Sequence, residues 1–201
     1  MFHPDEATVS RPAPPEEPTG VYLIDPVRSA IGFSDRHAMT AGVAGVRGNF
    51  TAFEGLLKLD GVCPARSEAY LSVQTGSVDT GCPERDARVT GPEFLDSATF
   101  PLMSFRSTRV LDAGDDRLHL AGYLRIKDVE LPVHLDLVFR TPRREACGRG
   151  RVGLEGTLTP RRARPGPGGN AAPRPGGPPV GDRMRLTIDI SAVRTRPGQS
   201  R

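Results

Sequence analysis

Strict alternation of apolar and polar residues constrains this chain more than any other feature. In residues 117–126, apolar residues occupy every second position from Leu118 onward. In residues 131–139 they do so again from Leu131, and polar residues such as His134 fall between them. Successive side chains of a β-strand point to opposite sides, so a period of two predicts strands with one apolar face and one polar face.

The same alternation recurs over most of the chain. It covers residues 53–59, 69–73, 152–158 and 184–190, and shorter stretches that begin at Ile31 and Met103. Residues 113–116 and 127–130 join neighbouring segments over so few residues that only antiparallel hairpins fit. About eight antiparallel strands are therefore expected. Helical potential is confined to residues 40–48 and 83–96, and Pro83 suits the first turn of a helix.

Eight strands with one apolar face each must cover those faces. A closed barrel does so and leaves no free edge, and a two-sheet sandwich is the alternative. We predict an all-β chain that forms an eight-stranded antiparallel up-and-down barrel with one short helix. The spacing alone does not distinguish a filled interior from one with room for a ligand. The candidate lining residues are Phe33, Phe53, Leu71, Val73, Phe105, Leu120, Leu124, Leu135, Leu137, Leu154, Leu186 and Ile188.

Composition separates the predicted barrel from its surroundings. The chain has 23 Gly and 20 Pro among 201 residues, more than an average protein, and they concentrate in two segments that have little to bury. We expect a disordered leader over residues 1–20 and a barrel domain over 21–194. That domain includes a flexible loop at 160–179, and a disordered tail follows over 195–201.

Compartment and cysteine chemistry can also be predicted. No stretch approaches the roughly 20 apolar residues of a membrane span, and the first residues lack the basic and apolar regions of a secretory signal. We therefore expect a cytoplasmic protein with no integral membrane segment. Cys63, Cys82 and Cys147 lie far apart and form no CxxC motif, so we expect free thiols.

Several sequence blocks occur in a fixed order over residues 21–194. The first consists of Asp25, Pro26, Ser29, Phe33, Arg36, His37, Val46, Gly48, Phe50, Phe53 and Gly55. The second consists of Ser77, Thr80, Arg85, Asp86, Phe94, Asp96 and Pro101. Together they resemble the YceI-like family of lipocalin-like polyisoprenoid-binding proteins. The chain departs from the family pattern most in residues 160–179, where Arg162 is the main residue that still matches.

The resemblance implies a barrel whose apolar pore holds a long isoprenoid chain, such as a quinone tail or a polyprenyl chain. It does not imply catalysis, and we expect neither an enzyme nor a cofactor. His37, Arg85, Asp86 and Arg162 are then candidates for contact with a polar head group. The structural alternative is a polar cluster at a barrel end, with Arg85 and Asp86 as a helix cap or ion pair. Two other functions stay open. One is a ligand-free barrel that acts as a stress or interaction protein, and the other is an enzyme that uses His37, Arg85 and Asp86.

Other partners are weighed from the polar residues. His119 and His134 fall on the polar faces of neighbouring strands and can lie across from each other. Two histidines without a third ligand indicate solvated surface rather than a metal site, so we predict no metal. The Arg-rich segment 161–174 has no aromatic residues for base stacking, and we predict no nucleic-acid partner. A homodimer stays open, because the sequence does not define the oligomeric state.

Overall fold

The computed structural model describes residues 19–35, 47–114, 116–144, 150–160 and 184–195. One α-helix lies in this part of the chain, α1 (Pro83–Thr90), together with the 3-10 turns η1 (Pro26–Arg28), η3 (Pro64–Arg66) and η4 (Thr75–Ser77). The strands are β1 (Gly20–Ile24), β2 (Ala30–Asp35), β3 (Arg47–Phe50), β4 (Phe53–Leu59), β5 (Glu68–Gln74), β6 (Val78–Asp79), β7 (Leu102–Ala113), β8 (Arg117–Ile126), β9 (Val129–Arg144), β10 (Gly150–Pro160) and β11 (Met184–Arg194).

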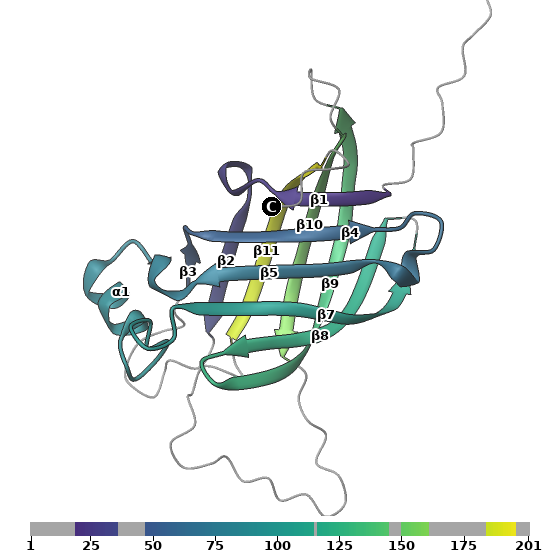
Figure 1. Cartoon of the computed structure of the whole chain (residues 1–201). Helices are drawn as coiled ribbons and strands as arrows, with labels where there is room; N and C mark the ends of the chain where they lie inside the picture. Colours follow the sequence, from purple (N-terminus) through teal and green to yellow (C-terminus); the bar gives the residue numbers. More distant parts are fainter. Residues whose placement is uncertain (1–18, 36–46, 115, 145–149, 161–183, 196–201) are drawn as a thin grey trace, which may run out of the picture.

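All of these strands pair antiparallel in one sheet that closes on itself. From β4 the order runs through β5, β7, β8, β9 and β10 to β11. The first half of β11 then pairs with β2, and its last residues pair with β1, which pairs with β4. β1 and β2 therefore share one strand position, as do β3 with β4 and β5 with β6. The result is a closed eight-stranded antiparallel barrel, which confirms the predicted fold (Figure 1).

The three interrupted strand positions mark a corner of the barrel. There, the backbone N–H of Thr51 donates to the Ser77 carbonyl, and that of Gln74 donates to the Ala52 carbonyl, both at 2.9 Å. The Ser77 hydroxyl accepts from the Ala52 N–H at 3.0 Å, so a side chain replaces a missing ladder bond. In Figure 1, strands β1, β4, β5 and β7 run across the near side, and β2, β11 and β10 run steeply behind them.

Alternation along the strands places one residue in two inside the barrel. In β8, Leu118, Leu120, Leu124 and Ile126 are buried, whereas Tyr123 between them is 42% exposed. The same pattern holds along β9, β10 and β11, and the buried side chains of all eight strand positions form one core cluster. The apolar face recognised in the sequence is therefore the inward face.

Inward glycines let side chains of the neighbouring strands lie against the barrel wall. At Gly122 a Cβ atom would lie 2.5 Å from the Arg106 carbonyl oxygen and 2.6 Å from the Phe105 ring. At Gly48 it would lie 2.7 Å from the Phe33 ring. Gly55 and Gly156 are covered in the same way by Ile24 and Leu137. Only glycine gives the two rings room to lie over the adjacent strand.

The helical predictions are partly wrong. Within 83–96 the helix ends at Thr90, and the Gly91 N–H caps it by donating to the Arg88 carbonyl. The helical potential assigned to 40–48 fails at its end, because Arg47 and Gly48 begin β3 and pair there with β2. Residues 40–46 and most of the loop at 160–179 lie outside the described residues. In the described ranges, no helix is long and apolar enough to cross a membrane.

Candidate functional site

The interior of the barrel gathers the residues predicted to line a cavity. Phe53 is half-buried, and each of the other eleven is at most 7% exposed. These twelve side chains come from β2, β4, β5, β7, β8, β9, β10 and β11, so residues far apart in sequence meet along one axis. The surface that they present is apolar and closely packed. A long apolar molecule can enter it only where these side chains move apart.

Tyr22 is an inward residue that the sequence analysis did not identify. It lies on β1 and is 4% exposed, whereas its neighbours Val21 and Leu23 are 40% and 51% exposed on the outer face. Because all of these residues are apolar or aromatic, the period of two does not show which face is buried. Burial raises the pKa of the Tyr22 phenol above its ordinary value of 10.0, and the positive charge of Arg194 opposes part of this rise. The phenol therefore stays protonated at neutral pH.

A polar cluster of Asp25, Ser29, Arg151 and Ser191 connects β1, β2, β10 and β11 at the point where η1 separates β1 from β2. The Arg151 guanidinium donates to the Asp25 carboxylate at 3.0 Å and to the Ser191 hydroxyl at 2.7 Å. The Ser29 hydroxyl donates to the Asp25 carbonyl at 2.7 Å and accepts from the Ser191 N–H at 2.9 Å. Asp25 also caps η1 through the Val27 N–H. Asp25, Pro26 and Ser29 of the first sequence block are thus structural.

A second polar cluster fastens α1 to the end of β6. The Asp86 carboxylate accepts from the Thr80 N–H at 2.9 Å and from the Thr80 hydroxyl at 2.6 Å. The Arg85 guanidinium donates to the Thr80 hydroxyl at 2.9 Å and to its carbonyl at 3.0 Å. Both charged residues therefore bond to one threonine. The other two head-group candidates, His37 and Arg162, lie outside the described residues.

His119 on β8 and His134 on β9 lie on the outer face of the barrel. The His119 Nδ1 atom contacts the Asp136 carboxylate, and the His119 and His134 rings meet edge to face with centroids 5.0 Å apart. The predicted proximity of the two histidines is therefore confirmed. The part of the chain that the structure describes has no group of three side chains suited to hold a metal ion. The Cys82 thiol donates to the Glu84 carboxylate at 3.2 Å, which lowers the pKa of Glu84.

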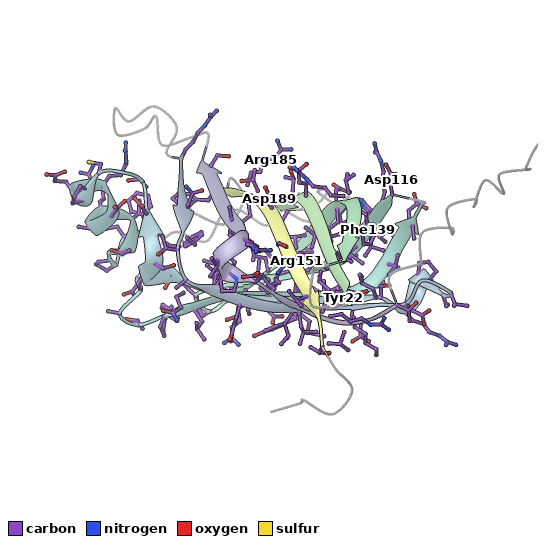
Figure 2. The ribbon with its side chains drawn as sticks, turned by 90° about the horizontal axis from the view of Figure 1, so that it is seen from above. Tyr22, Asp116, Phe139, Arg151, Arg185 and Asp189 are labelled. Carbon is purple, nitrogen blue, oxygen red and sulfur yellow. The ribbon has the colours of Figure 1, made fainter. Side chains whose placement is uncertain are left out.

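A groove of about 560 Å³ lies on the outer face of the barrel, across β2, β3, β9, β10 and β11. Small residues such as Ala30 and Gly32 leave it hollow. Its charged residues are Asp136, Glu155, Asp189 and Arg185, and Figure 2 shows the last two on the side away from Tyr22. This groove is separate from the apolar interior, because the strands present opposite faces to the two.

Comparison with known proteins identifies the family of this chain. The sequence profile described as YceI-like domain matches residues 22–192, which is most of the chain. The chain belongs to the YceI-like family. A UPF0312 protein of Vibrio vulnificus is 30% identical over 138 residues, which are 68% of this chain and 71% of the relative. A UPF0312 protein of Azotobacter vinelandii is 31% identical over 115 residues, which are 57% of this chain and 60% of the relative.

Solved structures have the same fold at low sequence identity. BcnA of Burkholderia cenocepacia superimposes with a TM-score of 0.61 at 19% identity, over 86% of this chain and 99% of that one. The YceI protein of Campylobacter jejuni gives 0.60 at 16% identity, over 77% and 88%. A polyisoprenoid binding domain from Saccharophagus degradans gives 0.51 at 14% identity, over 87% and 98%. The family membership of this chain and its barrel fold are thereby established.

Proposed function

We propose that this YceI-like chain binds a polyisoprenoid or a similar long apolar lipid inside its barrel and shields it from water. The observation that carries the proposal is the inward face, on which apolar side chains from all eight strand positions form one cluster. A related fold in Saccharophagus degradans is described as a polyisoprenoid binding domain, which supports this class of ligand.

Hydrophobic burial supplies the affinity in this proposal. An isoprene unit removes about five carbons from water, and at ~0.8 kcal/mol per carbon group this gives roughly 3–4 kcal/mol per unit before the cost of association. A few units then suffice for micromolar binding. Affinity should follow the length of the chain more than the chemistry of its head group.

The packed interior affects how a lipid can enter. Leu120, Leu154 and Leu186 are 0% exposed, so inward side chains must separate before a chain can lie between them. Association rate constants are typically about 10⁵–10⁷ M⁻¹s⁻¹ when the binding site is already formed. Binding that first requires the side chains to move apart is slower than this. Slow uptake of a fluorescent polyprenyl probe is therefore expected.

The polar clusters favour binding over catalysis. Arg85 and Asp86 are both bonded to Thr80, which is the structural role expected of a helix anchor. An enzyme built on them would first have to break these bonds. We also propose that the protein acts in the cytoplasm, and cell fractionation with a specific antibody would test this.

Extraction of the purified protein with organic solvent, followed by mass spectrometry, tests the proposal directly. An isoprenoid recovered in stoichiometric amount supports it. The matched variants are Leu135→Phe, which adds a ring inside the barrel, and Val138→Phe, which adds one outside. Leu135→Phe should weaken probe binding, and Val138→Phe should leave it unchanged. If the parent protein yields no lipid and binds no probe, the alternative of a ligand-free barrel that acts as a stress or interaction protein is favoured.

A further inference from the structure

The outer face of the barrel wall carries a row of mainly apolar and aromatic side chains, with Arg106 among them. Strand register places these residues side by side on β1, β4, β5, β7, β8 and β9. The outer row, as we call it, consists of Leu23, Leu56, Tyr70, Arg106, Tyr123 and Pro132. Four of its members are substantially exposed: Leu23 by 51%, Leu56 by 37%, Tyr70 by 39% and Tyr123 by 42%. Large exposed apolar surfaces of this kind mark interaction sites.

Charged residues flank the outer row in a regular order. On β4, Glu54 and Lys58 lie on either side of Leu56, and on β8 Arg125 lies beside Tyr123. Lys58 is paired with Glu68 at 3.6 Å. Within the described ranges, neither Glu54 nor Arg125 has a hydrogen-bonded or ion-paired side-chain partner. Each therefore has a charge available for a contact outside its own chain.

This face is complementary to itself about one particular axis. A two-fold axis that runs parallel to the strands, between β5 and β7, places β5 of one copy over β7 of the other and β4 over β8. Along the outer row, Tyr70 then meets Arg106 and Leu56 meets Tyr123. In the next row of the register, which consists of Glu54, Ser72, Ser104 and Arg125, Glu54 meets Arg125 and Ser72 meets Ser104. Of these four contacts, three join apolar groups, an aromatic ring with a cation, or opposite charges, and none joins like charges.

A two-fold axis that runs along the outer row, perpendicular to the strands, is unfavourable. An axis along the outer row places each of its residues over its own copy, so Arg106 of one copy would meet Arg106 of the other. Like charges in contact disfavour association.

We propose that two copies of the chain associate face to face through β4, β5, β7 and β8 about the axis between β5 and β7. Figure 1 shows these strands as neighbours on the near side of the barrel. Four strands about 4.8 Å apart and about seven residues long cover roughly 450 Å² on each copy. The two copies together bury about 900 Å², below a standard stable interface, so the dimer should be weak and concentration-dependent. This inference is independent of the proposed ligand.

A charge swap tests the axis itself. Sedimentation velocity of the full chain over micromolar to millimolar concentrations should show reversible dimerisation of the parent. Glu54→Arg and Arg125→Glu should each weaken it about tenfold, and the double variant should restore it. Three strand spacings, about 14 Å, separate these residues within one copy, so they cannot rescue each other inside a single chain.

Two further variants control for the apolar contact. Tyr70→Ala should weaken the dimer about tenfold, whereas Val138→Ala, on the outer face of β9, should leave it unchanged. Circular dichroism and thermal melting of each variant establish that it is folded. The proposal is overturned by a parent that stays monomeric throughout, or by single variants that dissociate without rescue in the double variant. It is also overturned if Tyr70→Ala abolishes sedimentation with vesicles of phosphatidylcholine and phosphatidylglycerol and leaves self-association unaffected, since the face would then be a membrane contact.

Discussion

Gly122→Ala tests whether the inward glycines are required for the barrel wall. The new Cβ atom would lie 2.5 Å from the Arg106 carbonyl oxygen and 2.6 Å and 2.9 Å from two carbons of the Phe105 ring. Real Cβ atoms do not approach other atoms so closely. The carbonyl belongs to the backbone of β7, and the Phe105 ring is 1% exposed, so neither group can move away without disturbing the sheet.

The magnitude follows from two opposing effects. Overpacking of a dense core costs about 1–3 kcal/mol, and the upper part of that range applies because one of the contacts is backbone. Replacement of glycine by alanine also restricts the unfolded chain, which contributes about 0.4–1 kcal/mol in favour of the variant. We expect a net loss of about 2 kcal/mol, or a fall of about 4–8 °C in Tm for a domain of this size.

Gly114→Ala is the matched control, measured by urea denaturation and thermal melting together with the parent. Gly114 lies in the turn between β7 and β8, and a Cβ atom there would meet no other atom within 4 Å. This variant should be as stable as the parent or slightly more stable. If Gly122→Ala melted at the same temperature as Gly114→Ala, the barrel wall would be able to relax, and the steric argument would be wrong.

Three further predictions concern the polar groups. Arg151→Met should lower the free energy of unfolding by about 1–3 kcal/mol, because it leaves the half-buried Asp25 carboxylate without its partner. Lys58→Met removes one partner of the exposed Lys58–Glu68 pair and should change the free energy of unfolding by less than about 1 kcal/mol. Equal losses of stability in Arg151→Met and Lys58→Met would contradict the importance of the Asp25–Arg151 pair. Asp86→Ala should destabilise by about 1–2 kcal/mol in urea titrations, because the Thr80 N–H and hydroxyl lose their acceptor, and the exposed control Glu93→Ala should be neutral. The raised pKa of Tyr22 means that the folded state holds the phenolic proton more tightly than the unfolded state. The stabilisation that comes from this difference in the pKa of Tyr22 is complete below pH 10.0 and is lost as the pH rises through the pKa of the folded state. Tyr22→Phe should therefore lose less stability than the parent when the urea midpoint is followed upward from pH 10.0, and identical losses would exclude this role for Tyr22.

The strands and their inward faces could be predicted from sequence because the signal is local. A period of two in residues 117–126 and 131–139 requires only that neighbouring side chains point to opposite sides of one strand. The same signal does not decide the orientation where both faces are apolar. That is why Tyr22 was not identified as an inward residue and why Val21 and Leu23 were not identified as outward ones.

The contacts that close the barrel depend on residues distant in sequence. Asp25 and Arg151 meet across 126 positions because η1 brings the end of β1 to β11 and β10, and nothing local to Arg151 distinguishes it from the other arginines of the chain. The outer row arises in the same way, since its residues become neighbours only through the register of six strands. The sequence by itself determined which residues are apolar and with what period, and therefore that the chain forms antiparallel strands with one apolar face each. Tertiary structure alone decided which charges meet and which apolar residues stay outside, because pairing between strands is a property of the closed sheet and not of any one strand.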